Sequence, residues 1–327
     1  MRIAITGGAG YVGSALRQAI VARGDTWRGL SRRTRLGRVP PAEAGGGEWV
    51  EGELADAGAL DRLVRDADAV VHAAAWVHRD APDTASREAC FAVNLRGTER
   101  LLEAVRRAGD RAPFVFVSST SVYGEAFADR TEAGPCEPAG AYGESKLAAE
   151  NAVMRFAAAR PAVVIRPAMV YGPGAPGNIA KLASFVRRGF APLVDGGRNR
   201  KSIVHADDLA VALLAAVDRA TECSGAILNA ASDPAPTMRE VGDALAAGLG
   251  RGLTWVPVPR PIWNAAASLG HWRSRSTSGR AADFGRTMEV YASTTTVVAS
   301  AIRARLGVSF RDAREGLAES VRVAPRG

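Results

Sequence analysis

The sequence predicts an α/β protein built on a doubly wound parallel sheet, and three observations support this fold class. Short β-rich runs alternate with amphipathic helical stretches through the first half of the chain. The β-rich runs are continuously apolar, as strands are when helices cover both faces of a sheet. A glycine-rich turn directly follows the first run and opens the first helical stretch.

The elements of the first half follow one another in a regular order. Periodicity and β-branched content predict strands at 2–6, 26–30, 48–52, 68–74, 113–119 and 162–167. Amphipathic helices are predicted between most of them, at 11–23, 57–66, 86–108 and 142–160. The proline- and glycine-rich stretch 40–47 is expected to be a loop.

After residue 166 this rhythm changes, which indicates a second, smaller lobe. The pattern predicts a loop, then further helices and strands, at 171–178, 179–189, 201–205, 206–220, 226–230, 237–249 and 259–269. The stretch 271–286 has no clear pattern. We expect residues 1–168 to form the sheet domain, rejoined by a segment near 201–230, and 169–327 to form mainly a mixed α/β C-terminal lobe.

Composition excludes several classes of protein. The 327 residues are 47% hydrophobic and 23% charged, without an apolar run of the roughly 20 residues that a membrane helix needs. The first residues enter a strand pattern at once, so we expect no signal peptide. Three widely spaced cysteines indicate neither a disulfide framework nor a metal site, and we expect a cytoplasmic location.

The net charge of +8 does not indicate a nucleic-acid partner. Such a surface interleaves basic residues with aromatic ones, but the densest basic run, 30–38, contains no aromatic residue. We expect arginines spread over solvated faces, with this run facing an anionic small molecule.

The glycine turn predicts a dinucleotide site. Gly7, Gly10 and Gly13 follow the first strand with spacing G-x-x-G-x-x-G. Glycine permits positive φ and a close approach of backbone to ligand. The following helix N-terminus offers N–H groups and a positive dipole end to a pyrophosphate.

The end of the second strand bears on the choice of cofactor. Sites that prefer NAD place an acidic residue there for the ribose 2′-hydroxyl, whereas arginine accommodates a 2′-phosphate. This sequence has Ser31, Arg32 and Arg33 and no acid. The pattern favours NADP and leaves NAD possible.

In order along the chain, the glycine turn, the strand end "VFVSSTSVYGE" and the pair Tyr142-x-x-x-Lys146 carry a family resemblance. The chain resembles the extended short-chain dehydrogenase/reductases of the NAD-dependent epimerase/dehydratase type, which include UDP-galactose 4-epimerase and nucleotide-sugar 4-ketoreductases. Stretches at 72–75, 94–104, 165–174, 201–210 and 306–320 also follow the family's order. The resemblance implies a Rossmann-type fold and a C-terminal lobe that binds substrate.

The resemblance also implies roles for individual residues. Tyr142 would be the general acid/base, Lys146 its helper and Ser119 the hydroxyl that binds the substrate oxygen. Cofactor contacts would come from Gly7, Gly10, Tyr11, Val12, Gly13, Ser31, Arg32, Arg33, Glu53, Leu54, Ala73, Ala74, Asn94, Val117, Tyr142, Lys146 and Pro167. Substrate contacts would come from Ser119, Asn178, Arg200 and Lys201.

The spacing of the tyrosine and lysine has a physical reason. Only three of the 42 Lys and Arg residues are lysines. A free tyrosine has a pKa of about 10, and a nearby cation lowers it toward the neutral range. Because residues i and i+4 share one helix face, Tyr142 and Lys146 would point together into the cleft at the sheet's carboxyl edge.

The resemblance leaves the substrate open. The leading reading is Tyr–Lys-assisted hydride transfer on a nucleotide-diphosphate sugar, by a 4-epimerase or a 4-keto-sugar reductase. A 4,6-dehydratase is disfavoured, because Thr120 and Ser121 stand where those enzymes carry an Asp-Glu pair. An NADPH-dependent reductase of a sterol-like or other hydrophobic ketone is the alternative, favoured by an apolar pocket without basic residues. A non-catalytic NADP sensor is a third reading. A homodimer is also expected from the resemblance.

Overall fold

The computed structural model describes residues 1–32, 46–77, 84–109, 112–274 and 288–322. For residues 84, 85 and 270–274 it describes the backbone only. Its centre is a seven-stranded parallel sheet in the order β11-β7-β5-β4-β1-β2-β3. These strands are β1 (Arg2–Thr6), β2 (Thr26–Ser31), β3 (Gly47–Glu51), β4 (Ala69–His72), β5 (Phe114–Val117), β7 (Ala162–Pro167) and β11 (Ile227–Ala230). The predicted fold class is confirmed.

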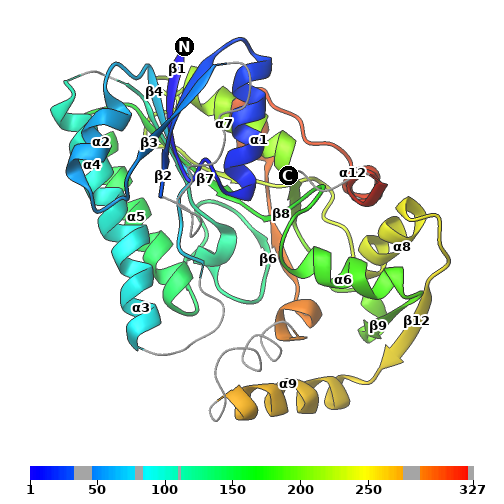
Figure 1. Ribbon diagram of the computed structural model, residues 1–327. Helices are drawn as coiled ribbons and strands as arrows, with labels where there is room; N and C mark the ends of the chain where they lie inside the picture. Colours follow the sequence, from blue (N-terminus) through cyan, green and yellow to red (C-terminus); the bar gives the residue numbers. More distant parts are fainter. Residues whose placement is uncertain (33–45, 78–83, 110–111, 275–287, 323–327) are drawn as a thin grey trace.

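Helices cover both faces of this sheet (Figure 1). On one face α1 (Tyr11–Ala22), α7 (Ala206–Asp218) and α11 (Ser300–Leu306) bury leucines and isoleucines against the strands. On the other face α2 (Ala57–Val64), α4 (Gly97–Arg107) and α5 (Ala141–Ala157) enclose a second core around Phe114 and Phe156. The strands are apolar on both sides because each side meets a helical layer.

One predicted helix is interrupted. The stretch expected as a single helix at 86–108 is α3 (Thr84–Phe91), a π-helical turn (Ala92–Arg96) and α4. A π-helical turn holds an extra residue and re-aims the side chains within it, often next to a functional site. Here it contains the buried Asn94.

The remaining elements form a cap at the carboxyl edge of the sheet (Figure 1). Helices α6 (Asn178–Arg187), α8 (Met238–Gly248) and α12 (Ala313–Arg322) enclose a third core. Helix α8 begins at a capping box, in which Thr237 and Glu240 each accept from the other's backbone N–H. Helix α9 (Arg260–Ser274) extends from the end of the cap.

Six short strands of the cap region form three parallel two-stranded sheets. They are β6 (Phe127–Arg130) with β13 (Thr295–Val297), β8 (Met169–Tyr171) with β10 (Ile203–His205), and β9 (Phe190–Val194) with β12 (Thr254–Val258). Only the β10 stretch was predicted, because runs of three to five residues carry little periodicity.

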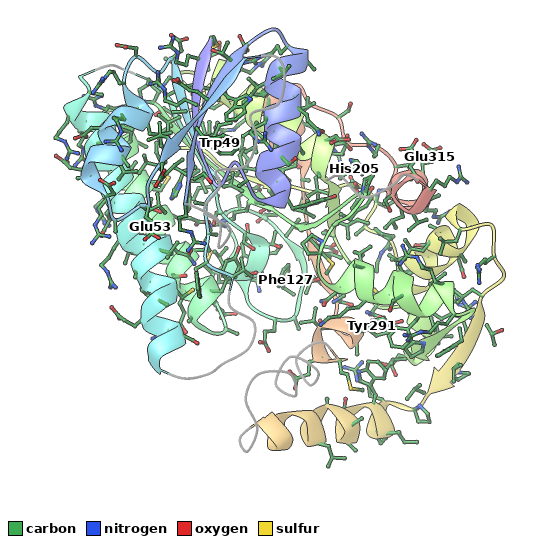
Figure 2. All side chains as sticks on the ribbon, in the orientation of Figure 1. Trp49, Glu53, Phe127, His205, Tyr291 and Glu315 are labelled. Carbon is green, nitrogen blue, oxygen red and sulfur yellow. The ribbon has the colours of Figure 1, made fainter. Side chains whose placement is uncertain are left out.

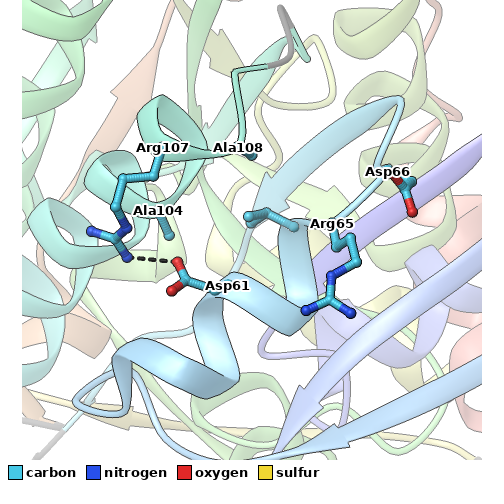
Figure 3. A pocket seen from close by; sticks show the side chains of 7 residues that line it. Asp61, Arg65, Asp66, Ala104, Arg107 and Ala108 are labelled. Carbon is cyan, nitrogen blue, oxygen red and sulfur yellow. Dashed lines mark hydrogen bonds and ion pairs between the residues drawn. The ribbon is translucent and has the colours of Figure 1, made fainter.

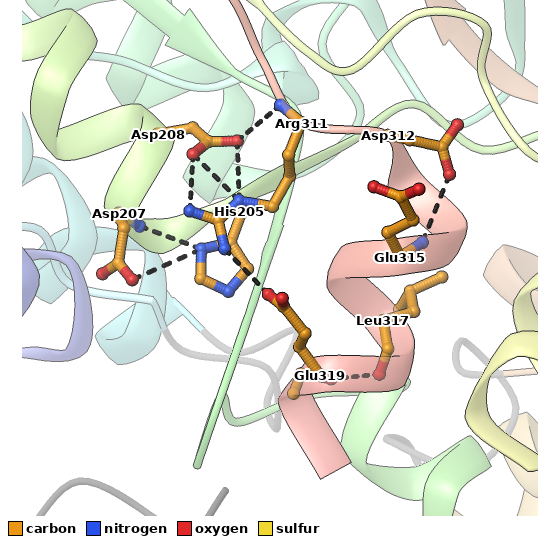
Figure 4. A network of polar contacts seen from close by, with 9 residues as sticks. His205, Asp207, Asp208, Arg311, Asp312, Glu315, Leu317 and Glu319 are labelled. Atoms are coloured by element: carbon orange, nitrogen blue, oxygen red, sulfur yellow. Dashed lines mark hydrogen bonds and ion pairs between the residues drawn. The ribbon is translucent and has the colours of Figure 1, made fainter. Parts of the chain in front are cut away.

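A charged cluster ties the sheet domain to the end of the cap (Figure 4). Arg311, just before α12, pairs with Asp208 on α7 at 2.8 Å and with Glu319 on α12 at 3.3 Å. His205 caps α7, its Nδ1 accepting from the Asp207 backbone N–H. Two parts of the chain separated by about a hundred residues are thereby held together.

Within the described residues, no helix has the length and apolar character needed to cross a membrane. Nor do those residues contain a group of three or more His, Cys, Asp or Glu side chains placed to bind a metal ion.

Candidate active site

A cavity of about 520 Å³ lies where the carboxyl ends of the strands meet the cap. The glycine turn after β1, the ends of β4, β5 and β7, and the start of α5 contribute to its lining. Cap residues complete the wall, among them Phe127, whose place between the sheet and the cap is visible in Figure 2. This is the edge at which doubly wound sheets bind ligands, near the switch in strand order between β1 and β4.

The glycine turn leaves no room for side chains. Gly7 has φ +72°, and a Cβ there would lie 2.6 Å from the backbone of Ala73. A Cβ on Gly13 would lie 2.1 Å from the Gly7 carbonyl oxygen. No side chain caps α1 and no acid lies in its first turn, so the dipole there is uncompensated by side chains. This cradle fits a pyrophosphate.

A buried arginine supports the turn from below. Arg17 Nε donates to the Gly8 carbonyl oxygen at 3.0 Å. The Arg17 guanidinium lies 5.0 Å from the Trp27 ring and 5.2 Å from the Trp49 ring, so it is stacked on both. This support could not be predicted from local motifs, because Arg17, Trp27 and Trp49 come from three different elements.

Ser119, Tyr142 and Lys146 all line the same cavity. Lys146 is 1% exposed, and its Nζ donates to the Val117 carbonyl oxygen at 2.5 Å and lies 4.1 Å above the Phe116 ring. Burial lowers the pKa of the Lys146 ammonium to about 7, against an opposing effect of Glu150 and Cys90. The Ser119 hydroxyl donates to Ser121 Oγ at 3.0 Å.

Asn94 is placed differently from the prediction. It does not line the cavity; its Oδ1 accepts from the Trp76 backbone N–H at 2.6 Å, and its Nδ2 donates to Ser145 Oγ at 2.9 Å. The side chain therefore joins the loop after β4 to α5, beside Lys146. Of the two predicted alanines, Ala73 lines the cavity, while the Ala74 N–H is directed to Thr6 Oγ1.

Of the residues predicted to select the cofactor, Ser31 and Arg32 lie outside the lining of this cavity. Ser31 is buried at the end of β2, where its hydroxyl donates to the Arg32 carbonyl oxygen. Arg32 is exposed, and Arg33 falls outside the described residues. Glu53 is exposed and Leu54 packs against Gly97. The preference for NADP stays a prediction.

The predicted substrate residues divide into two groups. Asn178, at the start of α6, lines the cavity as expected. Lys201 is 2% exposed, and its Nζ donates to the Val290 carbonyl oxygen at 2.5 Å and to Ser293 Oγ at 3.0 Å. Arg200 Nε donates to the Ala235 carbonyl oxygen. Neither residue lines the cavity, so the expectation that they face a diphosphate is not met by this arrangement.

Several lining residues were not predicted. They come from the loop after β5, from β8 and its flanks, and from the segment that carries β13: Ser121, Glu125, Phe127, Ala139, Met169, Val170, Pro176, Ser202, Val290 and Thr295. For Glu125, Met169 and Val170 the sequence signal was their place in motifs such as "VYGE" and "AMVYGPG", whereas Val290 and Thr295 lie beside no motif. Among the described lining residues, Lys146 is the only cation and Glu125 the only carboxylate.

A second, smaller hollow lies between α2 and α4 (Figure 3). Arg107 Nη2 pairs there with Asp61 at 2.6 Å, and both side chains are about half exposed. None of the predicted site residues lines this hollow. Its charges form an ordinary surface pair of small energetic value.

The chain is similar to proteins of a known family. The model of the "NAD dependent epimerase/dehydratase family" matches residues 3–231. The chain belongs to this family. The predicted family, the extended short-chain dehydrogenase/reductases, is thus confirmed. So is the prediction that the protein is an NAD(P)-dependent enzyme.

Two similar proteins carry names that refer to different substrates. The chain is 31% identical to 2-alkyl-3-oxoalkanoate reductase of Stenotrophomonas maltophilia, over 76% of each protein. It is 31% identical to dTDP-6-deoxy-L-talose 4-dehydrogenase (NAD(P)(+)) of Kitasatospora kifunensis, over 79% of this chain and 83% of that protein. Its match to protein y4nG of Sinorhizobium fredii is 30% identical over 65% of this chain, but spans only about half (52%) of that relative.

Among solved structures, one similar protein is MoeE5 in complex with UDP-glucose and NAD. The TM-score is 0.74 at 25% identity, and the alignment covers 98% of this chain and 97% of that one.

Proposed function

We propose that this protein is an NAD(P)-dependent oxidoreductase that transfers a hydride at a carbonyl or carbinol carbon. One observation carries the proposal: Ser119, Tyr142 and Lys146 line a single cavity together with Gly7, Gly10 and Gly13. A proton-transfer group, a cation and a hydroxyl donor thus share one space with a pyrophosphate cradle.

A nicotinamide dinucleotide, when bound, supplies or accepts the hydride. The chain's own residues do the rest. Tyr142 moves a proton to or from the substrate oxygen, and the Ser119 hydroxyl donates a hydrogen bond to that oxygen and polarises it. Lys146 presents a compact ammonium beside the phenol, favouring the phenolate form. The N–H groups at the start of α1 hold the pyrophosphate.

We propose NADP as the cofactor, from Ser31, Arg32 and Arg33 at the end of β2. The MoeE5 neighbour, which binds NAD, keeps NAD as the competing cofactor. Mass spectrometry of cofactor released from purified protein distinguishes them, with titration of NADPH and NADH where none is released.

The cavity wall bears on the class of substrate. No described arginine lines it, and the Lys201 ammonium is directed to the 290–293 segment instead. Phe127, Met169 and Val290 contribute apolar surface. This favours a ketone with a large apolar portion over a diphosphate; the name of the 2-alkyl-3-oxoalkanoate reductase relative refers to such a ketone, which carries alkyl chains and a single carboxylate.

A nucleotide-diphosphate sugar, the substrate that the sequence favours, is the second candidate. It is favoured by the talose dehydrogenase relative and by the UDP-glucose complex of MoeE5. A panel containing long-chain β-keto compounds and nucleotide sugars decides between the two. Turnover confined to the apolar ketones supports the first, and turnover confined to nucleotide sugars overturns it.

The catalytic proposal is tested by Tyr142→Phe. We expect turnover to fall by about 100-fold or more, because the phenol can no longer transfer a proton. The affinity for cofactor, measured by fluorescence titration, should stay within about twofold of the wild type, because an unchanged cradle sets it. Tyr291→Phe removes a hydroxyl that donates to the Pro192 carbonyl oxygen and serves as the control. Undiminished turnover in Tyr142→Phe would refute the assignment.

A further inference from the structure

The buried carboxylate of Glu150 lies one helical turn beyond Lys146, and the proposed mechanism gives it no role. Glu150 is 1% exposed on α5. Its Oε1 accepts from the Ser118 hydroxyl at 2.5 Å and from Arg166 Nε at 2.9 Å, and its Oε2 accepts from Arg166 Nη2 at 2.6 Å. Burying two charges is costly, so a bidentate pair at this depth needs a reason beyond stability.

The contacts of Glu150 converge on the site. Three consecutive residues at the end of β5 are used in three ways: the Val117 carbonyl accepts from Lys146, the Ser118 hydroxyl donates to Glu150, and Ser119 lines the cavity. Tyr142, Lys146 and Glu150 are spaced i, i+4 and i+8 on α5, running from the cavity into the protein.

The charges around Lys146 give Glu150 a second effect. The titratable groups that interact electrostatically with Lys146 are His72 on β4, Cys90 on α3 and Glu150 on α5 itself. Tyr142 precedes Lys146 by four residues on the same helix. Glu150 is the only carboxylate in this set of described residues. Desolvation disfavours the charged Lys146, and the electrostatic attraction of Glu150 opposes that effect.

Arg166 supplies the counter-charge to the Glu150 carboxylate. Its guanidinium also donates to the Tyr123 hydroxyl, which in turn donates to Asn229 Oδ1, each at 2.8 Å. The network therefore reaches from β5 and α5 through β7 to β11. It fixes the carboxylate in a position that no single hydrogen bond would hold.

We propose that Glu150 is a positioning residue for the reaction: its carboxylate, held by Arg166 and Ser118, favours the charged form of Lys146 one turn away on α5 and anchors the strand end that carries Ser119. The inference rests on the proposed function for its catalytic meaning. The charge state of Lys146 can be measured without any substrate.

The scarcity of lysine makes that measurement direct. Full-length protein labelled with ¹³C at lysine Cε gives signals from only Lys146, Lys181 and Lys201. The variants Lys146→Met and Lys201→Met assign them. In the wild type, Lys146 should titrate at about pH 7. In Glu150→Gln we expect its midpoint to fall by about one pH unit or more, because the opposing attraction is lost.

Lys201 is the internal control, because its lowered pKa comes from desolvation alone and Glu150 is not among the causes. Its midpoint should not move. An unchanged or raised Lys146 midpoint, or an equal shift of both lysines, overturns the proposal.

Glu150→Gln leaves Arg166 buried without a counter-charge, so the variant can fail to fold. The double variant Glu150→Gln/Arg166→Gln removes both charges and keeps amide groups that can hydrogen-bond. It should fold and still show a lowered Lys146 midpoint. A wild-type midpoint in the folded double variant, or its failure to fold, would assign the pair a purely structural role and overturn the proposal.

Once a substrate is known, the pH profile gives a second readout. We expect the apparent pKa of the proton-transfer group to rise in Glu150→Gln, because a less charged Lys146 favours the phenolate less. A lysine shift with an unmoved pH profile would confirm the electrostatic link and refute its catalytic meaning. The proposed function is tested by a different experiment: undiminished turnover in Tyr142→Phe would refute it without bearing on the Lys146 midpoint.

Discussion

At the scale of the residue, the choice of lysine at position 146 follows from its surroundings. The side chain is enclosed, and its nitrogen meets one carbonyl oxygen and the face of one aromatic ring. A compact ammonium can use such a site, whereas the five donors of a guanidinium would remain largely unsatisfied. In a chain that uses arginine almost everywhere else, this explains the exception.

We therefore expect Lys146→Arg to be far from conservative. Overpacking and unsatisfied donors should lower the free energy of unfolding by about 1–3 kcal/mol. Dinucleotide affinity should fall about tenfold or more. Thermal denaturation and fluorescence titration measure the two effects. Lys181→Arg, on α6 and outside the lining of the cavity, is the matched control and should change neither.

At the scale of the element, the structure follows the sequence wherever a long periodic segment decides the outcome. Every strand of the central sheet was predicted, and α1, α2, α5 and α7 appear where apolar periodicity placed them. The π-helical turn around Asn94 was not predicted, because the side chain is recruited by Trp76 and Ser145, which are distant in sequence.

The candidate site divides in the same way. Gly7, Gly13 and Lys146 could be predicted because local motifs fix them. Phe127, Met169 and Val290 could not, because their approach to the cavity depends on short strands paired across long stretches of chain. Lys201 was misplaced in its expected role because its motif contains no information on the 290–293 segment that accepts its hydrogen bonds.

The first turn of α1 offers an element-scale prediction. Gly13→Ala places a methyl group 2.1 Å from the Gly7 carbonyl oxygen, so the turn must move. We expect dinucleotide affinity to fall about tenfold or more, since about 1–3 kcal/mol of strain falls on the cradle itself. Gly58→Ala, in the first turn of α2, is the control, because a Cβ there meets nothing closer than 3.4 Å. Equal affinities in the two variants would contradict this account.

At the scale of the whole molecule, buried bases set how stability depends on pH. Burial lowers the pKa of both Lys146 and Lys201 from 10.5 to about 7. It also lowers the pKa of His72 from 6.5 to about 3. Each group binds fewer protons when folded than when unfolded. Its stabilising contribution is therefore lost as pH falls from the unfolded to the folded value.

We accordingly expect the protein to be more stable at about pH 9 than at pH 7. Each lysine contributes a slope of up to about 1.4 kcal/mol per pH unit. The gain ends near pH 10, because burial raises the pKa of Tyr171 and Tyr291 and favours their neutral forms. Urea denaturation across this range measures the slope. Lys201→Met should remove about half of it, and a flat profile in the wild type would contradict the prediction.

The division of the cavity between two parts of the chain has an evolutionary consequence. The lining from the sheet, α5 and β6 comes from before residue 168, whereas β8, Ser202 and the segment that carries β13 contribute the lining from the later part of the chain. Under the proposed function, the residues of hydride chemistry therefore all come from the first half of the chain, whereas much of the substrate-facing wall, Met169 and Val290 included, comes from the second half. Mutation or recombination in the second half can therefore change the substrate specificity of a descendant while its catalytic residues are inherited unchanged.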